Sequence, residues 1–108
     1  MPNRTVRLET NDRLLRRALA AQLRHEQDFR LLDTDDHADG SDIVVSTTTD
    51  LPIERCRELA AAGARVVVLA AIPTSDERAR YEQAGASAYI PMTADGPLLL
   101  KEIREAVS

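Results

Sequence analysis

The chain has 108 residues and a formal net charge of −4, with 44% hydrophobic and 30% charged residues, so it forms one domain with a single core. The acidic balance argues against nucleic-acid binding by this chain alone. The longest apolar run, Val66–Ile72, is far too short to cross a bilayer.

The first half of the chain predicts three strands and one helix. Val6 and Leu8 alternate with Arg7 and Glu9, which predicts a strand over residues 5–9. Residues 10–12 supply turn and N-cap chemistry, and apolar residues at helical spacing predict a helix from there to about residue 24. Residues 28–34 predict a second strand. The apolar run within 42–46 predicts a third strand, buried on both faces.

The second half predicts three helices and two strands in alternation. Pro52 in a first turn and Gly63 at a C-cap bound one predicted helix, and residues 65–72 form the most strongly predicted strand. Thr74 and Glu77 form a capping-box pattern that begins a helix ending at Gly85. Residues 86–90 predict the last strand. A final helix is predicted from residue 95 or 96 to residue 107.

This alternation predicts a parallel sheet with helices on its faces, in one domain spanning residues 1–108. Only about seven residues separate the second and third predicted strands, where a parallel crossover takes a dozen or more. The helix at that place is therefore predicted to be missing or reduced to a turn. Polar Arg7, Glu9 and Arg30 indicate that one face of this half of the sheet is solvated or docks a partner, and we favour solvated side chains.

Three successive segments in the second half of the chain resemble the receiver domain of response regulators in two-component signalling. They read Ala64-Arg65-Val66-Val67-Val68-Leu69-Ala70-Ala71, Ser75-Asp76-Glu77-Arg78-Ala79-Arg80 and Ala84-Gly85-Ala86-Ser87-Ala88-Tyr89-Ile90-Pro91. The resemblance implies a flavodoxin-like, doubly wound α/β fold with strand order 2-1-3-4-5. It also implies a site where loops converge at the carboxyl ends of the strands.

At the positions where receivers keep their phosphorylation chemistry, this sequence has other residues. By the resemblance, the pocket consists of Thr10, Asn11, Asp12, Ser46, Thr47, Ala70 and Met92, with a switch-like aromatic at Tyr89. Thr10 and Asn11 replace the acidic pair that binds the metal, and a slip of one residue would bring in Asp12. One carboxylate beside an amide is a poor magnesium site.

The phosphoryl acceptor is also replaced. Ser46 or Thr47 stands where the family has its phosphoacceptor Asp, and a hydroxyl needs a general base before it can act as a nucleophile. Ala70 replaces the hydroxyl that senses the phosphoryl group, and Met92 replaces the Lys that pairs with it. The sequence therefore predicts a pseudo-receiver with no enzymatic activity, metal or cofactor.

Such a module would act by dimerisation or through a signalling partner protein. By the resemblance, the dimer face comprises Arg78, Arg80, Glu82, Lys101, Glu102, Arg104 and Glu105, whose mixed charges can pair across a twofold axis. The expected role is the regulatory domain of a transcriptional response regulator that reaches DNA only through an output domain. Both an excised domain and a free-standing protein stay open. The lone cysteine, Cys56, predicts a reducing cytoplasm, and no membrane association is expected.

Two further hypotheses stay open beside the pseudo-receiver. The first is a small-molecule sensor that uses the degenerate pocket, since ligands of this architecture bind at the carboxyl ends of the strands. The second is residual phosphotransfer through Asp12 and Thr47, which ranks last because the sequence shows no evident general base.

Overall fold

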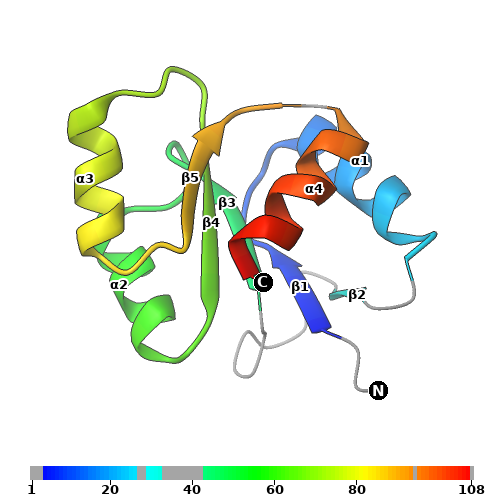
Figure 1. Ribbon diagram of the computed structural model, residues 1–108, viewed down its shortest axis with the longest axis horizontal. Helices are drawn as coiled ribbons and strands as arrows, with labels where there is room; N and C mark the ends of the chain where they lie inside the picture. Colours follow the sequence, from blue (N-terminus) through cyan, green and yellow to red (C-terminus); the bar gives the residue numbers. More distant parts are fainter. Residues whose placement is uncertain (1–3, 27–28, 33–42, 94, 108) are drawn as a thin grey trace.

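The computed structural model describes residues 4–26, 29–32, 43–93 and 95–107, in which strands and helices form one parallel sheet with helices on both faces (Figure 1). The strands are β1 (Arg4–Leu8), β2 (Phe29–Leu32), β3 (Ile43–Thr47), β4 (Arg65–Ala70) and β5 (Ala88–Pro91). The helices are α1 (Arg13–Leu23), α2 (Ile53–Ala61), α3 (Ser75–Gln83) and α4 (Gly96–Val107). The sheet order is β2-β1-β3-β4-β5, so the predicted flavodoxin-like fold is confirmed.

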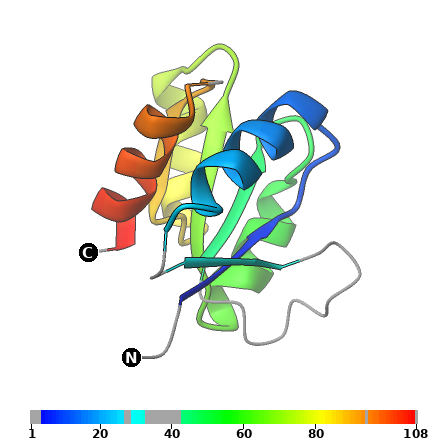
Figure 2. The ribbon, with the colours of Figure 1, turned by 90° about the vertical axis from the view of Figure 1, so that its right-hand side faces the viewer.

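The two central strands divide their side chains between two cores, one on each face of the sheet, where the chain length predicted a single core. Every residue of β3 is buried, and so is every residue of β4 except Arg65. Val45 and Val67 pack with α1 and α4, whereas Val44 and Val66 pack with α2 and α3. Continuous apolar runs therefore form these strands because helices cover both faces. Figures 1 and 2 show α1 and α4 side by side over one face and α2 and α3 over the other.

Side-chain caps fix the starts of three helices. Asp12 is the N-cap of α1, and its Oδ1 atom accepts the N–H of Leu15 at 2.9 Å. Thr74 Oγ1 accepts the N–H of Glu77 at 3.1 Å and begins α3. At α4, the Oδ1 atom of Asp95 accepts the N–H of Leu98 at 3.1 Å. Pro52 was predicted to lie in the first turn of α2. It is instead the N-cap, and the helix begins at the next residue, Ile53.

The strand ends differ from the sequence prediction by up to two residues. The strand predicted to reach Ile72 ends at Ala70, which pairs with Pro91, the last residue of β5. Ile72 is 80% exposed, because β4 has no neighbouring strand to continue the ladder there. The apolar run therefore overestimates the length of the strand.

The polar face of β1 is not freely solvated, which corrects the sequence interpretation. The Arg7 and Glu9 side chains are only 17% and 21% exposed, and they lie 3.7 Å apart. Arg55 on α2 pairs with Glu9 at 2.8 Å. Arg7, Glu9 and Arg55 thus form an ion cluster at the edge of the core that packs with α2 and α3, which we call the second core. Arg30 on β2 is exposed, as expected.

The predicted loss of a helix between β2 and β3 concerns residues 33–42, which lie outside the described residues. Among the four described helices, α2, α3 and α4 are the three that follow β3, β4 and β5. None of these four helices is long and apolar enough to cross a membrane.

Candidate functional site

The carboxyl ends of β1, β3, β4 and β5 surround a cavity of about 350 Å³. It is lined by Asn11, Asp12, Thr47, Thr48, Thr49, Asp50, Leu69, Ala71 and Met92. Parallel strands bring their carboxyl ends to one edge of the sheet, which explains how residues far apart in sequence meet here. Four predicted pocket residues, Asn11, Asp12, Thr47 and Met92, therefore lie together.

Asp50 is the central carboxylate of this edge, and the predicted pocket did not include it. Its Oδ2 atom accepts the hydroxyl of Thr10 at 2.6 Å and the N–H of Asn11 at 3.0 Å. These bonds favour the ionised form, so the Thr10 hydroxyl and the Asn11 N–H lower the pKa of Asp50. A carboxylate from the β3–α2 loop thus contacts residues 10 and 11.

The structure separates the two hydroxyls between which the sequence could not choose. Ser46 is fully buried and donates to the backbone carbonyl of Glu9, so it faces away from the cavity. Thr47 lines the cavity, and its Oγ1 accepts the N–H of Asp50 at 3.2 Å. Of the two, Thr47 is the hydroxyl at the end of β3 that a ligand could reach.

The opposite wall of the cavity is apolar. Leu69, Ala71 and Met92 line it, while Ala70 is fully buried and belongs to the second core. The Met92 N–H donates to the carbonyl of Ala70 at 2.8 Å, which places the thioether beside the end of β4. The wall therefore offers neither an ammonium group nor a hydroxyl to a phosphoryl oxygen.

The carboxylates of the cavity are few and already engaged. Asp12 caps α1 through its Oδ1 atom, and Asp50 binds Thr10 and Asn11. The described residues include no group of three or more His, Cys, Asp or Glu that could hold a metal ion. Asp50 is also a weak general base for Thr47, because its lowered pKa disfavours proton uptake.

Tyr89, the predicted switch-like aromatic, is buried and bonded through its hydroxyl. The hydroxyl donates to the carboxylate of Glu77 and accepts the N–H of Thr74 at 3.2 Å. The return bond expected of a capping box, from Thr74 N–H to Glu77, is thus replaced by a path through Tyr89. The ring lies 6.0 Å from that of Tyr81, and Arg78 lies 5.3 Å from its centroid.

A second cavity, of about 270 Å³, lies on the β1 side of the same edge. It is lined by Arg7, Leu8, Glu9, Thr10, Asn11, Arg16 and Asp50. Asn11 and Asp50 line both cavities, so they form the wall between them. No local sequence pattern points to this cavity, because its residues come from β1, the β1–α1 loop, α1 and the β3–α2 loop.

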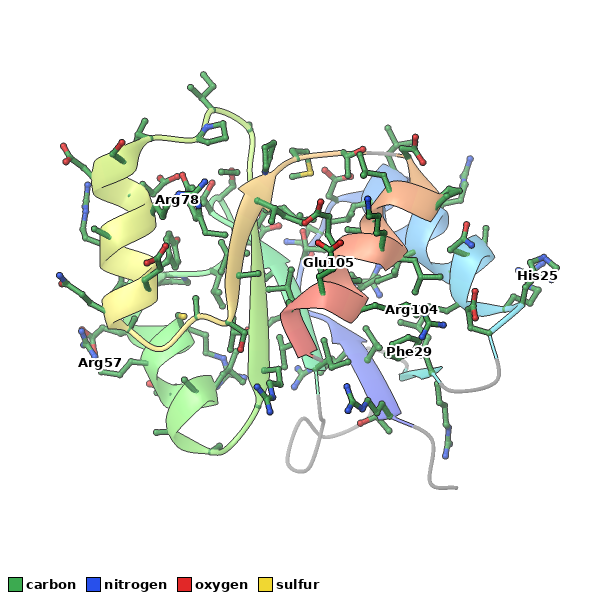
Figure 3. The ribbon with its side chains drawn as sticks, viewed as in Figure 1. His25, Phe29, Arg57, Arg78, Arg104 and Glu105 are labelled. Carbon is green, nitrogen blue, oxygen red and sulfur yellow. The ribbon has the colours of Figure 1, made fainter. Side chains whose placement is uncertain are left out.

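The predicted dimer-face residues divide between two surroundings. Arg78 on α3 packs on the ring of Tyr89, whereas Arg104 on α4 donates to Glu26 at 2.8 Å and lies 4.8 Å from the ring centroid of Phe29. Figure 3 shows Arg104 directed toward Phe29, away from α3. Lys101, Arg104 and Glu105 also line a groove with Gln22 of α1.

Solved structures similar to this chain include response-regulator receiver proteins. No protein-family model matches the sequence, and a search of curated proteins finds no match. A response regulator from Thermotoga maritima aligns with a TM-score of 0.79 at 19% identity, over 98% of both chains. A LuxR-family response regulator from Aurantimonas sp. SI85-9A1 gives a TM-score of 0.78 at 19% identity, over 98% of this chain and 86% of that chain. The fold of this chain is therefore the receiver fold.

A further neighbour is HP1043, an orphan response regulator of H. pylori, with a TM-score of 0.76 at 18% identity. The alignment covers 99% of this chain and 100% of that chain. At these identities the similarity establishes the fold and not the function.

Proposed function

We propose that this chain is a receiver-like signalling module that works without phosphoryl transfer. The observation that carries the proposal is Thr47, which lines the cavity at the end of β3 where receivers have their acceptor Asp. Ala70 and Met92 support it, because neither can contact a phosphoryl group as a hydroxyl or an ammonium would. Asp50 keeps one carboxylate at this edge, but its hydrogen bonds to Thr10 and Asn11 already engage it.

In this proposal the module is not an enzyme, and its output is a protein contact in the cytoplasm. A homodimer or a signalling partner would use the charged surfaces of α3 and α4. One solved structure with a similar fold is a LuxR-family response regulator. This similarity supports a role in regulating transcription through an output domain. Tyr89 would contribute to this protein contact from its buried position, in which its hydroxyl bonds to Glu77 and to the N–H of Thr74.

The test is an amide NMR titration with magnesium and beryllofluoride, a mimic of the phosphoryl group. We expect no saturable shifts at Asn11, Thr47, Asp50 or Met92 at millimolar magnesium. Saturable shifts there that disappear in both Thr47→Ala and Asp50→Asn would overturn the proposal. Arg57→Gln is the matched control, because Arg57 pairs with exposed Glu54 on α2.

A second candidate function is small-molecule sensing in the 350 Å³ cavity. Its apolar wall of Leu69, Ala71 and Met92 faces the hydroxyl of Thr47, the combination of surfaces that small-ligand sites use. A ligand that binds the folded state raises the melting temperature. A dimerising module instead shows a melting temperature that depends on protein concentration, so thermal unfolding at several concentrations, with and without a compound library, separates the two functions.

A further inference from the structure

Arg7 is a nearly buried guanidinium whose hydrogen-bonding capacity is largely unused. Its side chain is 17% exposed, and among the described residues its acidic contact is Glu9 Oε1, 3.7 Å from Nη2. That separation is too long for a hydrogen bond. The Arg7 Nε atom is buried and has no hydrogen-bond partner in the part of the chain that the structure describes. Such an unsatisfied donor calls for an explanation, since buried polar groups are almost always bonded.

The carboxylates beside Arg7 are engaged elsewhere. Glu9 receives three contacts from Arg55, at 2.8, 3.1 and 3.2 Å. Asp50 accepts from Thr10 and from the N–H of Asn11. Neither carboxylate hydrogen-bonds to Arg7, so the cavity that Arg7 lines keeps an excess of donors.

Arg16 supplies a second guanidinium to the same cavity. It comes from the first turns of α1, and its Nη2 atom donates to the backbone carbonyl of Thr10 at 2.7 Å. A carbonyl satisfies one donor and carries no compensating charge. Arg7 and Arg16 therefore line one cavity of about 270 Å³ with donors that remain available.

We propose that this cavity binds a compact oxyanion, a single carboxylate or phosphate group, between Arg7 and Arg16. The planar fork of a guanidinium matches two oxygens of such a group, and Nε is part of that fork. Glu9 and Asp50 in the lining disfavour a polyanion by repulsion, and the volume suits an ion of a few heavy atoms. The site lies across the Asn11–Asp50 wall from Thr47, so the inference does not depend on the proposed function.

The experiment uses the whole chain and the side-chain Nε–Hε signals of its arginines in NMR spectra. Sodium phosphate and sodium acetate are titrated separately at a constant ionic strength set with sodium chloride. We expect a saturable shift of the Arg7 Nε–Hε signal, together with the amides of residues 8–11. Saturation by phosphate, by acetate or by both supports the site and identifies which group it prefers.

Two variants and one control connect the shift to the site. Arg7→Gln is expected to weaken binding by about tenfold or more, the loss of one charge-assisted contact. Arg16→Gln, on a partly exposed helix position, is expected to weaken it as well and covers the case in which Arg7→Gln does not fold. Arg57→Gln should leave it unchanged, because Arg57 lies at the outer side of the molecule (Figure 3).

Three results would overturn the proposal. One is a shift that grows linearly with both salts and never saturates. Another is an anion affinity that is the same in the native chain, in Arg7→Gln and in Arg16→Gln. The third is a saturable shift centred on Thr47 and Met92, which would place the anion in the other cavity.

Discussion

The guanidinium of Arg55 on α2 binds the carboxylate of Glu9, 46 positions earlier in the chain. The Nη2 atom lies 2.8 Å from Oε1, and Nε lies 3.1 and 3.2 Å from the two carboxylate oxygens. This fork joins α2 to the end of β1 across the edge of the second core. It stands where the sequence predicted solvated side chains, and it leaves Arg7 without a closely bonded carboxylate.

The first prediction concerns this ion pair. Arg55→Gln or Glu9→Gln should lower the free energy of unfolding by about 1 kcal/mol, the upper part of the range for partly exposed pairs. The pair Arg57–Glu54 is the matched control on the same helix, with side chains 56% and 77% exposed. Arg57→Gln should cost only a few tenths of that amount. Urea unfolding of the four proteins measures both, and equal losses would contradict the role given to Glu9.

The second prediction concerns the ionisation of Asp50. Hydrogen bonds from Thr10 and the Asn11 N–H lower its pKa in the folded state, so the unfolded chain binds this proton more tightly. The stabilisation is present above the usual Asp pKa of about 4 and is lost as the pH falls through the lowered value. Asp50→Asn should therefore be less stable than the native chain at pH 7, with a difference that shrinks toward pH 3.

Urea unfolding at a series of pH values checks this. Asp76→Asn, at an exposed position in the first turn of α3, is the control for general acid effects. A difference between Asp50→Asn and the native chain that stays constant with pH would contradict the bonding assigned to Asp50.

The third prediction concerns the two tyrosines. Burial raises the pKa of Tyr81 and of Tyr89, and the neighbouring Glu77 carboxylate raises both further. In the folded protein the phenolate absorption near 295 nm should therefore appear above pH 10, whereas the urea-unfolded chain should titrate near 10. Because the folded state holds these protons more tightly, stability should fall as the pH rises from 10 through the raised values.

Single variants assign the two titrations. Tyr89→Phe leaves Tyr81 alone and should also lower the melting temperature by roughly 4–8 °C, through loss of the hydroxyl between Thr74 and Glu77. Tyr81→Phe leaves Tyr89 alone in the same way. A folded-state titration near pH 10 in either variant would show that the remaining tyrosine is not buried as described.

The fourth prediction compares two glycines with positive φ. Gly85 has φ +103°, and an added Cβ would lie 2.6 Å from the Cβ of Ala60 on α2. Gly63 has φ +96°, and an added Cβ would meet nothing within 4 Å. Gly63→Ala should cost about 1–2 kcal/mol for the left-handed backbone alone. Gly85→Ala should cost roughly 1–3 kcal/mol more because α2 and α3 must move apart. Urea unfolding checks the order, and equal costs would contradict the close approach.

The sequence by itself determined the alternation of strands and helices and the parallel sheet, whereas the strand order was implied by the resemblance to receiver domains. Apolar runs such as Val66 to Leu69 and caps such as Asp12 and Thr74 report burial and helix starts within a few residues, so local pattern suffices for them. The resemblance to receiver domains singled out Tyr89 as a switch-like aromatic, and that role stays a prediction.

Only the tertiary structure decided which side chains share a site. It shows that Thr47 lines the cavity whereas Ser46 is buried. It also shows that Asp50 bonds to Thr10, 40 positions away, and that Arg104 packs on the ring of Phe29. It also placed Arg7 and Arg16 in one cavity. These contacts depend on the path of the β3–α2 loop and on how helices pack on the sheet. Neither the loop path nor the helix packing can be predicted from residue spacing along the chain, because residues far apart in sequence come into contact only after the strands have paired.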